Sequence, residues 1–337
     1  MLDLIIPSYK DKRGLFSSLF SIGLNDNVSI TIVDDCSGEK YEDVINTFSP
    51  FYPIRVIYTP KNGGPGFARQ YGFDNTFNPY VIFLDCGDNF TTPLQIKFML
   101  EEIINHPDAG MISYAHLEEK FGGLDFTASG NNRMHGKIYS RDFLQKYNIR
   151  FNTDTPRCNE DIGFNMNCRL IGEHIFNTEG KEVILENGDT AVIWRNTKNS
   201  ITRSNDCAFY YKEQNNGLAH GALAAMENAQ ENGVEEQLII ELGYDVFCST
   251  YFFYISTLNR RPEFAEESFD GAYHFYKNFF ADGQIDMDLL KIYYYNGLVG
   301  FLSDLEDPIR DTLNPYSIYN FITDLQVRYE NEVSSNE

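Results

Sequence analysis

The sequence predicts a parallel, doubly wound α/β sheet followed by a mainly helical region. Short apolar runs alternate with helical segments over the first part of the chain, which is typical of repeated strand–helix units. After about residue 206 the strand-like runs give way to long helical segments, and this part carries most of the excess negative charge. We therefore expect two domains, residues 1–206 and residues 207–337.

Four short apolar runs predict the first four strands. They are Leu2–Ile6, Ile30–Val33, Arg55–Tyr58 and Val81–Leu84. A segment with helical character follows each run, and the expected helices cover residues 15–22, 39–48, 67–77 and 91–107. This order predicts parallel strands joined by crossover helices.

Capping signals are expected to set where two of these helices begin. Ser37 precedes the second helix as a candidate N-cap, because its hydroxyl suits an unpaired backbone N–H. Thr92 is the candidate cap of the fourth helix, with Pro93 at the first helical position. The later helices are expected over residues 217–233, 234–259 and 287–305.

Composition excludes several classes of protein. The 337 residues are 42% hydrophobic and 15% aromatic, which suffices for a large core. A net charge of −22 argues against a general polyanion binder, since the electrostatic term has the wrong sign. The six cysteines show no C-x-x-C spacing, so free thiols in a reducing cytosol are expected. No basic leader opens the chain and no apolar run has the length of a membrane span, which predicts a cytoplasmic protein.

Polar and glycine-rich segments follow all four predicted strands. They read PSYK, DDCS, NGGPG and DCGD. In open α/β sheets ligands bind beyond the carboxyl ends of the strands, so one pocket should be lined by all four segments. Within the last one, Asp85 and Asp88 suit a hard divalent cation that prefers oxygen ligands. The alternative is an ordinary turn, because Asp and Gly favour turns for local reasons.

Taken together, these motifs resemble those of a family 2 glycosyltransferase with the GT-A fold. The matching segments cover roughly residues 1–206 and occur in the same order as in the family. They are LIIPSYK, IVDDCS, NGGPGFARQYG, FLDCGD, MHGKIYSRDF with NEDIGFN, and WRNTKNSITR. The resemblance implies a Rossmann-like, mostly parallel sheet and an inverting, metal-dependent enzyme that uses a nucleotide-sugar. One departure is Gly87, which stands where many relatives have a second Asp.

The resemblance also implies roles for individual residues. Asp88 would hold Mn²⁺ or Mg²⁺ against the diphosphate of the donor. Asp161 would be the catalytic base, with Glu160 beside it binding hydroxyls. Arg69 would lie over the base or near the phosphates, and Asp35, helped by Asp34, would bind uracil. The implied nucleotide-sugar site comprises Pro7, Ser8, Tyr9, Asp34, Asp35, Gly64, Arg69, Asp85, His135 and Lys137.

These roles agree with the chemistry of glycosyl transfer. A divalent cation stabilises the charge of a departing nucleoside diphosphate, and a carboxylate activates an acceptor hydroxyl. A base on one face and the leaving group on the other imply direct displacement with inversion. A simpler interpretation of Glu160 and Asp161 is that they stabilise a helix start, where acids are favoured. The simpler interpretation of His135 is a structural hydrogen-bonding residue.

The acceptor is left open by the sequence. A glycan or lipid-linked glycan leads, because these are common acceptors among relatives. A local excess of basic residues lies next to the expected site and suggests an anionic acceptor instead. Such an acceptor would be a teichoic-type polymer or hydroxymethylated bases in phage DNA. The basic residues are Arg133, Lys137, Arg141, Lys146, Arg150 and Arg157. A non-catalytic nucleotide-sugar-binding protein is the alternative of a different class. The helical region is expected to shape the acceptor side or to join subunits in a homo-oligomer.

Overall fold

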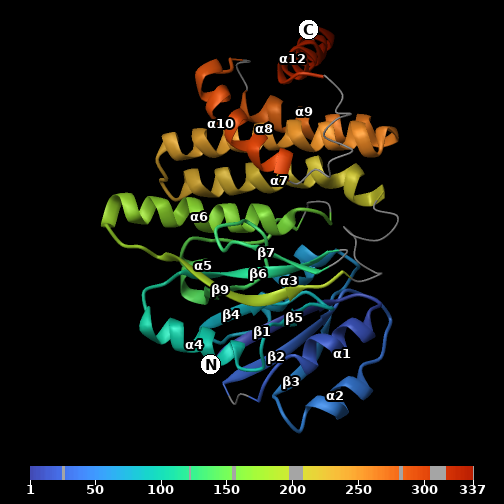
Figure 1. Cartoon of the computed structure of the whole chain (residues 1–337), viewed down its shortest axis with the longest axis vertical. Coiled ribbons are helices and arrows are strands. Elements are labelled where there is room, and N and C mark those ends of the chain that lie inside the picture. Colours follow the sequence, from blue (N-terminus) through green and yellow to red (C-terminus); the bar gives the residue numbers. More distant parts are fainter. Residues whose placement is uncertain are drawn as a thin grey trace. The chain divides into compact units, whose positions relative to one another are not determined.

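The computed structural model describes residues 1–24, 27–120, 123–153, 157–196, 208–280, 284–303 and 316–336. The chain divides into two compact units, Met1–Asn205 and Asp206–Glu337. The first unit contains the sheet and the second is helical (Figure 1).

The first half of the sheet consists of the four predicted strands. They are β1 (Leu2–Ser8), β2 (Val28–Asp34), β3 (Ile54–Tyr58) and β4 (Tyr80–Phe83). They pair in parallel in the order β3–β2–β1–β4. β1 is buried along its whole length, as expected for a central strand covered by helices on both faces.

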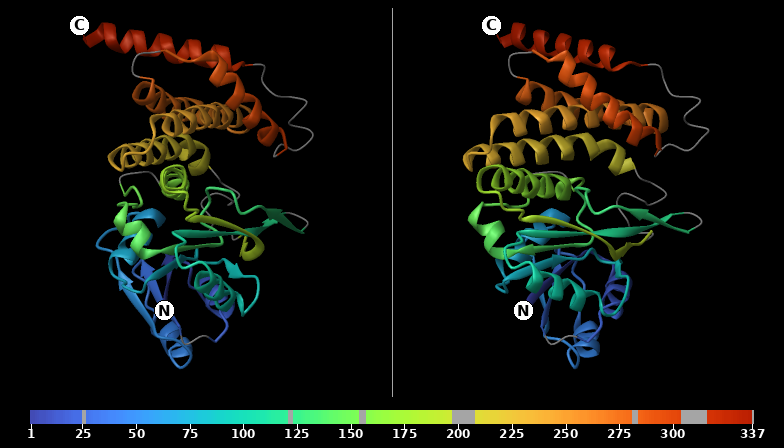
Figure 2. Two further views of the ribbon diagram at one scale, coloured as in Figure 1. Left: turned by 90° about the vertical axis from the view of Figure 1, so that its left-hand side faces the viewer. Right: turned by 60° about the vertical axis from the view of Figure 1, so that its left-hand side comes forward.

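The second half of the sheet is mixed and was not predicted from the sequence. It comprises β5 (Asn89–Phe90), β6 (Met111–Lys120), β7 (Gly123–Thr127), β8 (Lys137–Ser140) and β9 (Ile184–Trp194). β8 pairs antiparallel with both β4 and β6, whereas β9 is parallel to β6 and antiparallel to β5. β7 forms a hairpin with β6 that projects from the sheet (Figure 2). The fold is thus the predicted, mostly parallel one with an antiparallel portion added.

Six helices accompany this sheet: α1 (Lys12–Phe20), α2 (Glu42–Phe48), α3 (Pro65–Asp74), α4 (Gln95–Asn105), α5 (Arg141–Lys146) and α6 (Glu160–Glu179). Both predicted caps are wrong. Tyr41 occupies the N-cap of α2, while Ser37 forms a turn with Asp34. Leu94 occupies the N-cap of α4, and the Thr92 hydroxyl accepts from the N–H of Leu94 in a turn before the helix. Local turns compete with caps for the same hydroxyl groups.

The second unit contains α7 (Ala208–Glu231), α8 (Glu236–Arg260), a short 3₁₀ helix (Pro262–Phe264), α9 (Ala265–Phe279), α10 (Met287–Ser303) and α12 (Ile318–Asn336). Its core is built from aromatic rings on different helices. The Phe247 ring lies 5.1 Å from that of Phe280 and 6.0 Å from that of Phe321, measured between centroids. Such pairs add packing energy beyond the area they bury. Many aromatic residues of this region are therefore core residues.

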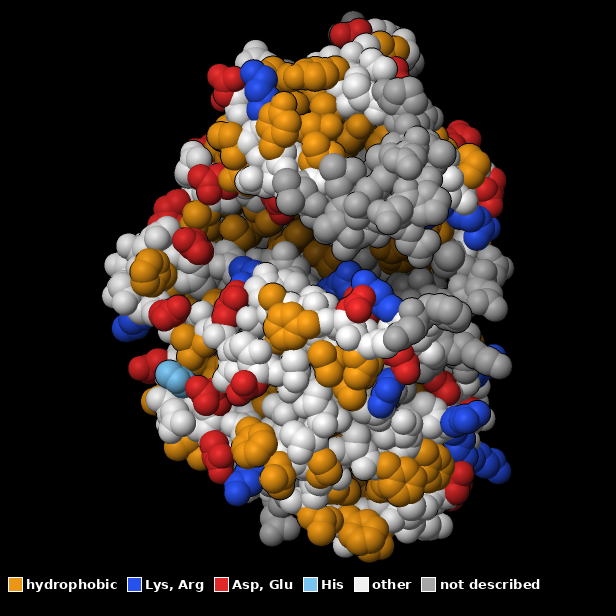
Figure 3. Space-filling model, viewed as in Figure 1, with side chains coloured by type: hydrophobic (Ala, Val, Ile, Leu, Met, Phe, Trp, Pro, Cys, Tyr) orange, Lys and Arg blue, Asp and Glu red, His pale blue; other side chains and the backbone are white. Residues whose placement is uncertain are grey.

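Apolar surface is also present on the helical unit. Apolar side chains gather on the face where α10 lies (Figure 3). On α10, Ile292 and Tyr295 are exposed. Among the described helices, α8 alone has the length and apolar composition of a membrane span, and 56% of that window is buried in the structure. Core helices of soluble proteins pass the same test, so this is weak evidence for a membrane span.

Candidate active site

The carboxyl ends of the parallel strands bring the predicted site segments to one edge of the sheet. Ser8 at the end of β1 lies opposite Asp34 at the end of β2, and Asp34 lies opposite Tyr58 at the end of β3. The Asp85–Asp88 turn follows β4, the other neighbour of β1. Regular parallel pairing therefore places residues from distant parts of the chain together, as the position of the motifs predicted.

The two carboxylates after β2 shape the neighbouring loops. Asp35 accepts hydrogen bonds from the backbone N–H groups of Gly63 and Gly64, at 2.9 and 2.7 Å. Gly64 has a φ of +87°, a conformation that favours glycine, and it immediately precedes α3. Asp34 accepts from the Tyr41 hydroxyl at 2.7 Å. Asp34 and Asp35 thus hold neighbouring backbone and side-chain groups at the edge of the sheet. Of the other predicted site residues at this edge, Pro7 lies within β1 and Tyr9 is exposed.

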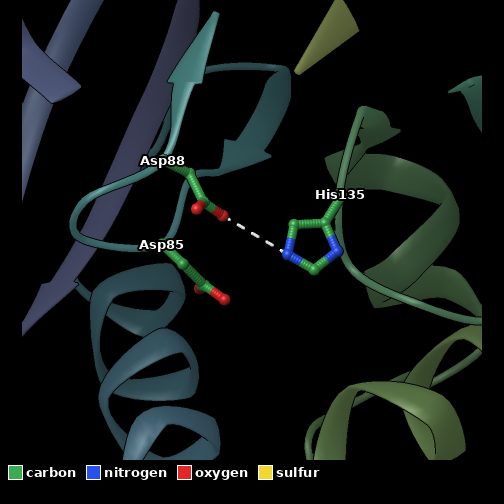
Figure 4. Close-up of side chains that lie close together, drawn as sticks. All are labelled: Asp85, Asp88 and His135. Atoms are coloured by element: carbon green, nitrogen blue, oxygen red, sulfur yellow. Dashed lines mark ion pairs between the residues drawn. The ribbon is translucent and has the colours of Figure 1, made fainter. Parts of the chain in front are cut away.

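Asp85, Asp88 and His135 form a compact cluster of possible metal ligands (Figure 4). One ligand atom from each lies within 4.8 Å of the others. The Nε2 atom of His135 is 3.3 Å from Oδ2 of Asp88. The other Asp88 oxygen accepts from the backbone N–H of Arg195 at 2.9 Å, which fixes the carboxylate. The cluster joins the turn after β4 to the loop before β8.

Ionisation in this cluster depends on burial and on neighbouring charges. Burial raises the pKa of Asp88, although contact with His135 opposes the shift. Desolvation also acts on Asp85, but Arg69 and His135 outweigh it and hold the pKa of Asp85 below its usual value. Within the described residues, Asp88 Oδ2 and both His135 ring nitrogens make no hydrogen bond. Buried polar atoms of this kind normally have a partner, so the cluster has capacity for a cation.

The backbone explains why Gly87 stands between the two acids. Its φ is +104°, a conformation that side-chain-bearing residues rarely adopt. Its N–H donates to the Ser18 hydroxyl at 2.9 Å, which ties the turn to α1. A second Asp at this position would be strained in the observed turn. His135 instead supplies the third potential ligand.

An aromatic stack holds His135, and the sequence gave no indication of it. Trp194, at the end of β9, lies 4.6 Å from the His135 ring with the planes 27° apart. The ring of His116, on β6, lies 5.0 Å from the ring of His135, measured between centroids. Because β6 was not predicted, nothing in the sequence placed His116 near Asp88. Trp194 opens the segment WRNTKNSITR, which resembles part of the family pattern, but that resemblance did not indicate a contact with His135.

A second acidic site lies at the first turn of α6. Asp161 accepts from the backbone N–H of Met134 at 3.0 Å. Glu160 is buried, and its carboxylate pairs with Arg69 at 2.6 Å. Burial raises the pKa of Glu160 to about 7, although Arg69 opposes this. Both acids therefore stand at a helix start, as the simpler interpretation expected, and both also contact residues of the site.

Arg69 bridges the two acidic sites. Its guanidinium lies between Asp85 and Glu160, at 2.5 and 2.6 Å, and its implied role beside the base or the phosphates stays a prediction. Its side chain is 3% exposed. Burial disfavours the charged form, but the two carboxylates outweigh it and raise the pKa of Arg69. The sequence could not predict this bridge, because 91 residues separate Arg69 from Glu160.

Lys137 and three of its basic neighbours have partners within the protein. The Lys137 ammonium is buried and donates to the backbone carbonyl of Arg133 at 2.6 Å rather than to the acidic cluster. Burial lowers the pKa of Lys137 to about 7. Three other members of the basic group have acidic partners, which are Arg133 with Glu118, Arg141 with Asp3 and Arg150 with Asp74. These ion pairs account for three of the six basic residues, and the anionic acceptor stays a prediction.

Comparison with known sequences identifies the matching region. Residues 3–159 match the model of glycosyl transferase family 2. An uncharacterized glycosyltransferase of Haemophilus influenzae is 30% identical over 108 residues, which cover 30% of this chain and 43% of the relative. The minor teichoic acid biosynthesis protein GgaA of Bacillus subtilis is 28% identical over 132 residues, 36% of this chain and 30% of GgaA. The matches thus span less than half of these relatives.

Comparison with solved structures shows the same fold. S. aureus TarS 1–349, in complex with UDP-GlcNAc, gives a TM-score of 0.61 at 15% identity, covering 82% of this chain and 80% of TarS 1–349. The mannosyltransferase PcManGT from Pyrobaculum calidifontis, in complex with GDP-Man and Mn²⁺, gives a TM-score of 0.53 at 11% identity, covering 97% of this chain and 86% of PcManGT. At these identities the likeness concerns the fold alone.

Proposed function

Residues 3–159 form a domain of glycosyl transferase family 2 with the GT-A fold, and we propose that the chain transfers a sugar from a UDP-sugar to an acceptor hydroxyl. The observation that carries this proposal is the pair of acidic sites at one edge of the sheet. The Asp85–Asp88–His135 cluster suits a cation and a diphosphate, and the Glu160–Asp161 site suits acceptor activation. The two sites share Arg69 as a partner.

The cluster fits Mn²⁺ or Mg²⁺. Two carboxylates and an imidazole converge there, and the Asp88 oxygen that faces His135 points into the group (Figure 4). The mixed oxygen and nitrogen donors favour Mn²⁺, because Mg²⁺ takes oxygen ligands almost alone. A bound cation of this kind stabilises charge on a departing diphosphate. The similarity to PcManGT, solved with Mn²⁺, supports this assignment.

The edge formed by β1 and β2 is the proposed nucleotide pocket. Ser8, Asp35 and Gly64 meet there, and Pro7, Tyr9 and Asp34 complete the wall. The similarity to TarS, solved with UDP-GlcNAc, supports a uridine nucleotide. Asp35 already orders the loop before α3, so a bound base would meet a fixed surface with little further ordering.

Asp161 is the proposed base that takes the proton from the acceptor hydroxyl. The Met134 N–H occupies one of its oxygens, which orients the carboxylate and leaves the other oxygen available. Glu160 is proposed to bind hydroxyls beside it. Attack on the anomeric carbon from the side opposite the diphosphate then inverts its configuration. The acceptor is proposed to be a glycan or lipid-linked glycan, and the similarity to GgaA supports a teichoic-type polymer as the alternative.

A donor and acceptor screen tests the proposal. Purified protein with MnCl₂ is incubated with UDP-GlcNAc, UDP-glucose, UDP-galactose or GDP-mannose, with and without glycan or teichoic-type acceptors. We expect UDP release that rises with the correct acceptor, and NMR should show an inverted anomeric centre. Nucleotide binding without turnover of any donor would favour the non-catalytic alternative, and a retained anomer would rule out the displacement mechanism.

A further inference from the structure

The two acidic sites are joined by two separate chains of contacts. In the first, the Arg69 guanidinium connects Asp85 to Glu160. In the second, His135 faces Asp88 while the adjacent residue, Met134, donates its N–H to Asp161. Each acid of the turn after β4 is therefore linked to one acid of the α6 start. The contacts form a closed ring through four segments of the chain.

We propose that this ring is a frame that fixes the acceptor base relative to the cation cluster, with Arg69 as its positioning residue. The inference rests on the proposed function and deepens it. A displacement needs the base and the departing diphosphate on opposite sides of one carbon, and small errors in that geometry are costly. Because the frame links both sites, ordering of the cation cluster also orders the start of α6, which carries Asp161.

The chemistry of Arg69 suits this role. A guanidinium has donors in a planar fork, so one side chain binds two carboxylates in different directions. Here Nη2 binds Asp85 and Nη1 binds Glu160; the Glu160 contact is buried, whereas the Asp85 side chain is 34% exposed. The Arg69 guanidinium also lies 5.7 Å from the centre of the Phe151 ring. A lysine would keep the charge but could not hold both carboxylates in this geometry.

The loop that forms the second link is itself anchored. Lys137 donates to the carbonyl of Arg133, and the Asn165 side chain on α6 donates to the carbonyl of Asn132 at 3.1 Å. The same Asn165 accepts from the Tyr139 hydroxyl at 2.8 Å. Met134 and His135 are thus held at fixed positions between α6 and the cluster. The backbone that carries a potential metal ligand is attached to the helix that carries the base.

Cation binding to the Arg69 variants separates positioning from charge. Removing Arg69 makes the cluster more negative, so electrostatics alone predicts tighter Mn²⁺ binding. If Arg69 positions Asp85, Arg69→Gln weakens Mn²⁺ binding by about tenfold or more, the range for residues that orient metal ligands. Arg69→Lys keeps the charge and should also weaken binding. The measurement is free Mn²⁺ by electron paramagnetic resonance, with UDP present.

Transmission along the frame is measured at α6. In the full-length wild type, saturating Mn²⁺ and UDP should slow hydrogen exchange at residues 160–166, because the frame orders this turn. Arg69→Lys should lose that protection at saturating ligand. Gly66→Ala offers a second variant without a change of charge, since its Cβ would lie 2.7 Å from Glu160 Cγ and displace that side chain. Gly66→Ala should lose the protection of α6 from hydrogen exchange. Its affinity for Mn²⁺ should change less than about threefold, because the substitution leaves Asp85 in place.

The controls distinguish a failure of the frame from a failure of the proposed function. Gly188→Ala is the matched control, because a Cβ there meets nothing within 4 Å. It should bind Mn²⁺ and protect α6 like the wild type. If the wild type binds no Mn²⁺ in the presence of UDP, the proposed function fails. If the wild type binds Mn²⁺, but α6 of Arg69→Lys and of Gly66→Ala is protected from hydrogen exchange as strongly as α6 of the wild type, the frame is overturned and the proposed function stands.

Discussion

Asp161 has one oxygen engaged by a backbone N–H, and its role depends on the other being able to take a proton. Asp161→Asn retains the shape and can still accept from Met134, but it cannot act as a base. We expect turnover to fall by about a hundredfold or more, the usual scale for losing a general base. Donor affinity should stay within about threefold, because the change removes no donor contact. Steady-state UDP release and UDP titration measure the two quantities.

Exposed Asp108 provides the matched control for this change. Asp108→Asn should leave turnover unaltered. Should Asp161→Asn retain wild-type turnover, the base lies elsewhere, and Glu160 would be examined next.

Residues of the site differ in how far the sequence could predict them. Asp85 and Asp88 follow a buried apolar run, so strand periodicity alone places them at the edge of the sheet. His116 comes from a strand that no pattern indicated, the contact of Trp194 with His135 was not predicted, and the Arg69 bridge spans a long stretch of sequence. Side-chain partners that are distant in the sequence depend on tertiary packing, which local patterns do not contain.

At the scale of elements, α7 and α9 make a close contact at Gly271. A Cβ on this residue would lie 2.4 Å from the backbone nitrogen of Asn216, so the helices would have to separate. We expect Gly271→Ala to lower the free energy of unfolding of the helical unit by about 1–3 kcal/mol, as overpacking does. Denaturant unfolding followed by tyrosine fluorescence measures this, with Gly188→Ala as the control. Equal stability of the two variants would contradict the contact.

The same two helices carry a stacked pair of histidines. The rings of His220 and His274 lie 4.2 Å apart, and burial, His220 and Lys277 together lower the pKa of His274. Below the ordinary histidine pKa the unfolded chain therefore binds more protons at this residue than the folded chain does. The contribution of His274 to stability is present above about pH 6.5 and is lost as pH falls through its lowered pKa.

Thermal unfolding at several pH values tests this linkage. The melting temperature should fall from pH 7.5 to pH 5.5, and His274→Asn should reduce that fall. His106, which is exposed on the sheet-containing unit, gives the control, and His106→Asn should leave the slope unchanged. An identical slope for His274→Asn and the wild type would show that the stacked pair carries no linkage.

Elements were predicted where burial produces a clear pattern. The parallel strands are continuous apolar runs, and the long helices have helical periodicity, so both were found. β7 is exposed along most of its length and β5 has only two residues, so neither leaves a recognisable pattern. β9 carries a bulge opposite Tyr114 and Ala115, which breaks its alternation.

For the whole molecule, the division into two units leads to a test of the helical one. None of the residues proposed to bind the donor lies beyond Asn205. We expect a shortened chain, residues 1–205, to bind UDP and Mn²⁺ like the full chain but to lose transfer to the true acceptor. Calorimetric titration and the transfer assay measure the two activities. Normal transfer by a monomeric shortened chain would show that the helical unit neither presents the acceptor nor joins subunits.

The central claim is that the cluster at the end of β4 binds a divalent cation together with a nucleoside diphosphate. Calorimetric titration of UDP into the full-length protein, with MnCl₂ and then with excess EDTA, tests it most directly, and Asp88→Ala is titrated in parallel. The account predicts that EDTA weakens UDP binding by the wild type by about tenfold or more, and that Asp88→Ala binds UDP equally weakly under both conditions. UDP binding by the wild type that is unchanged by EDTA, and equal in Asp88→Ala, would contradict it.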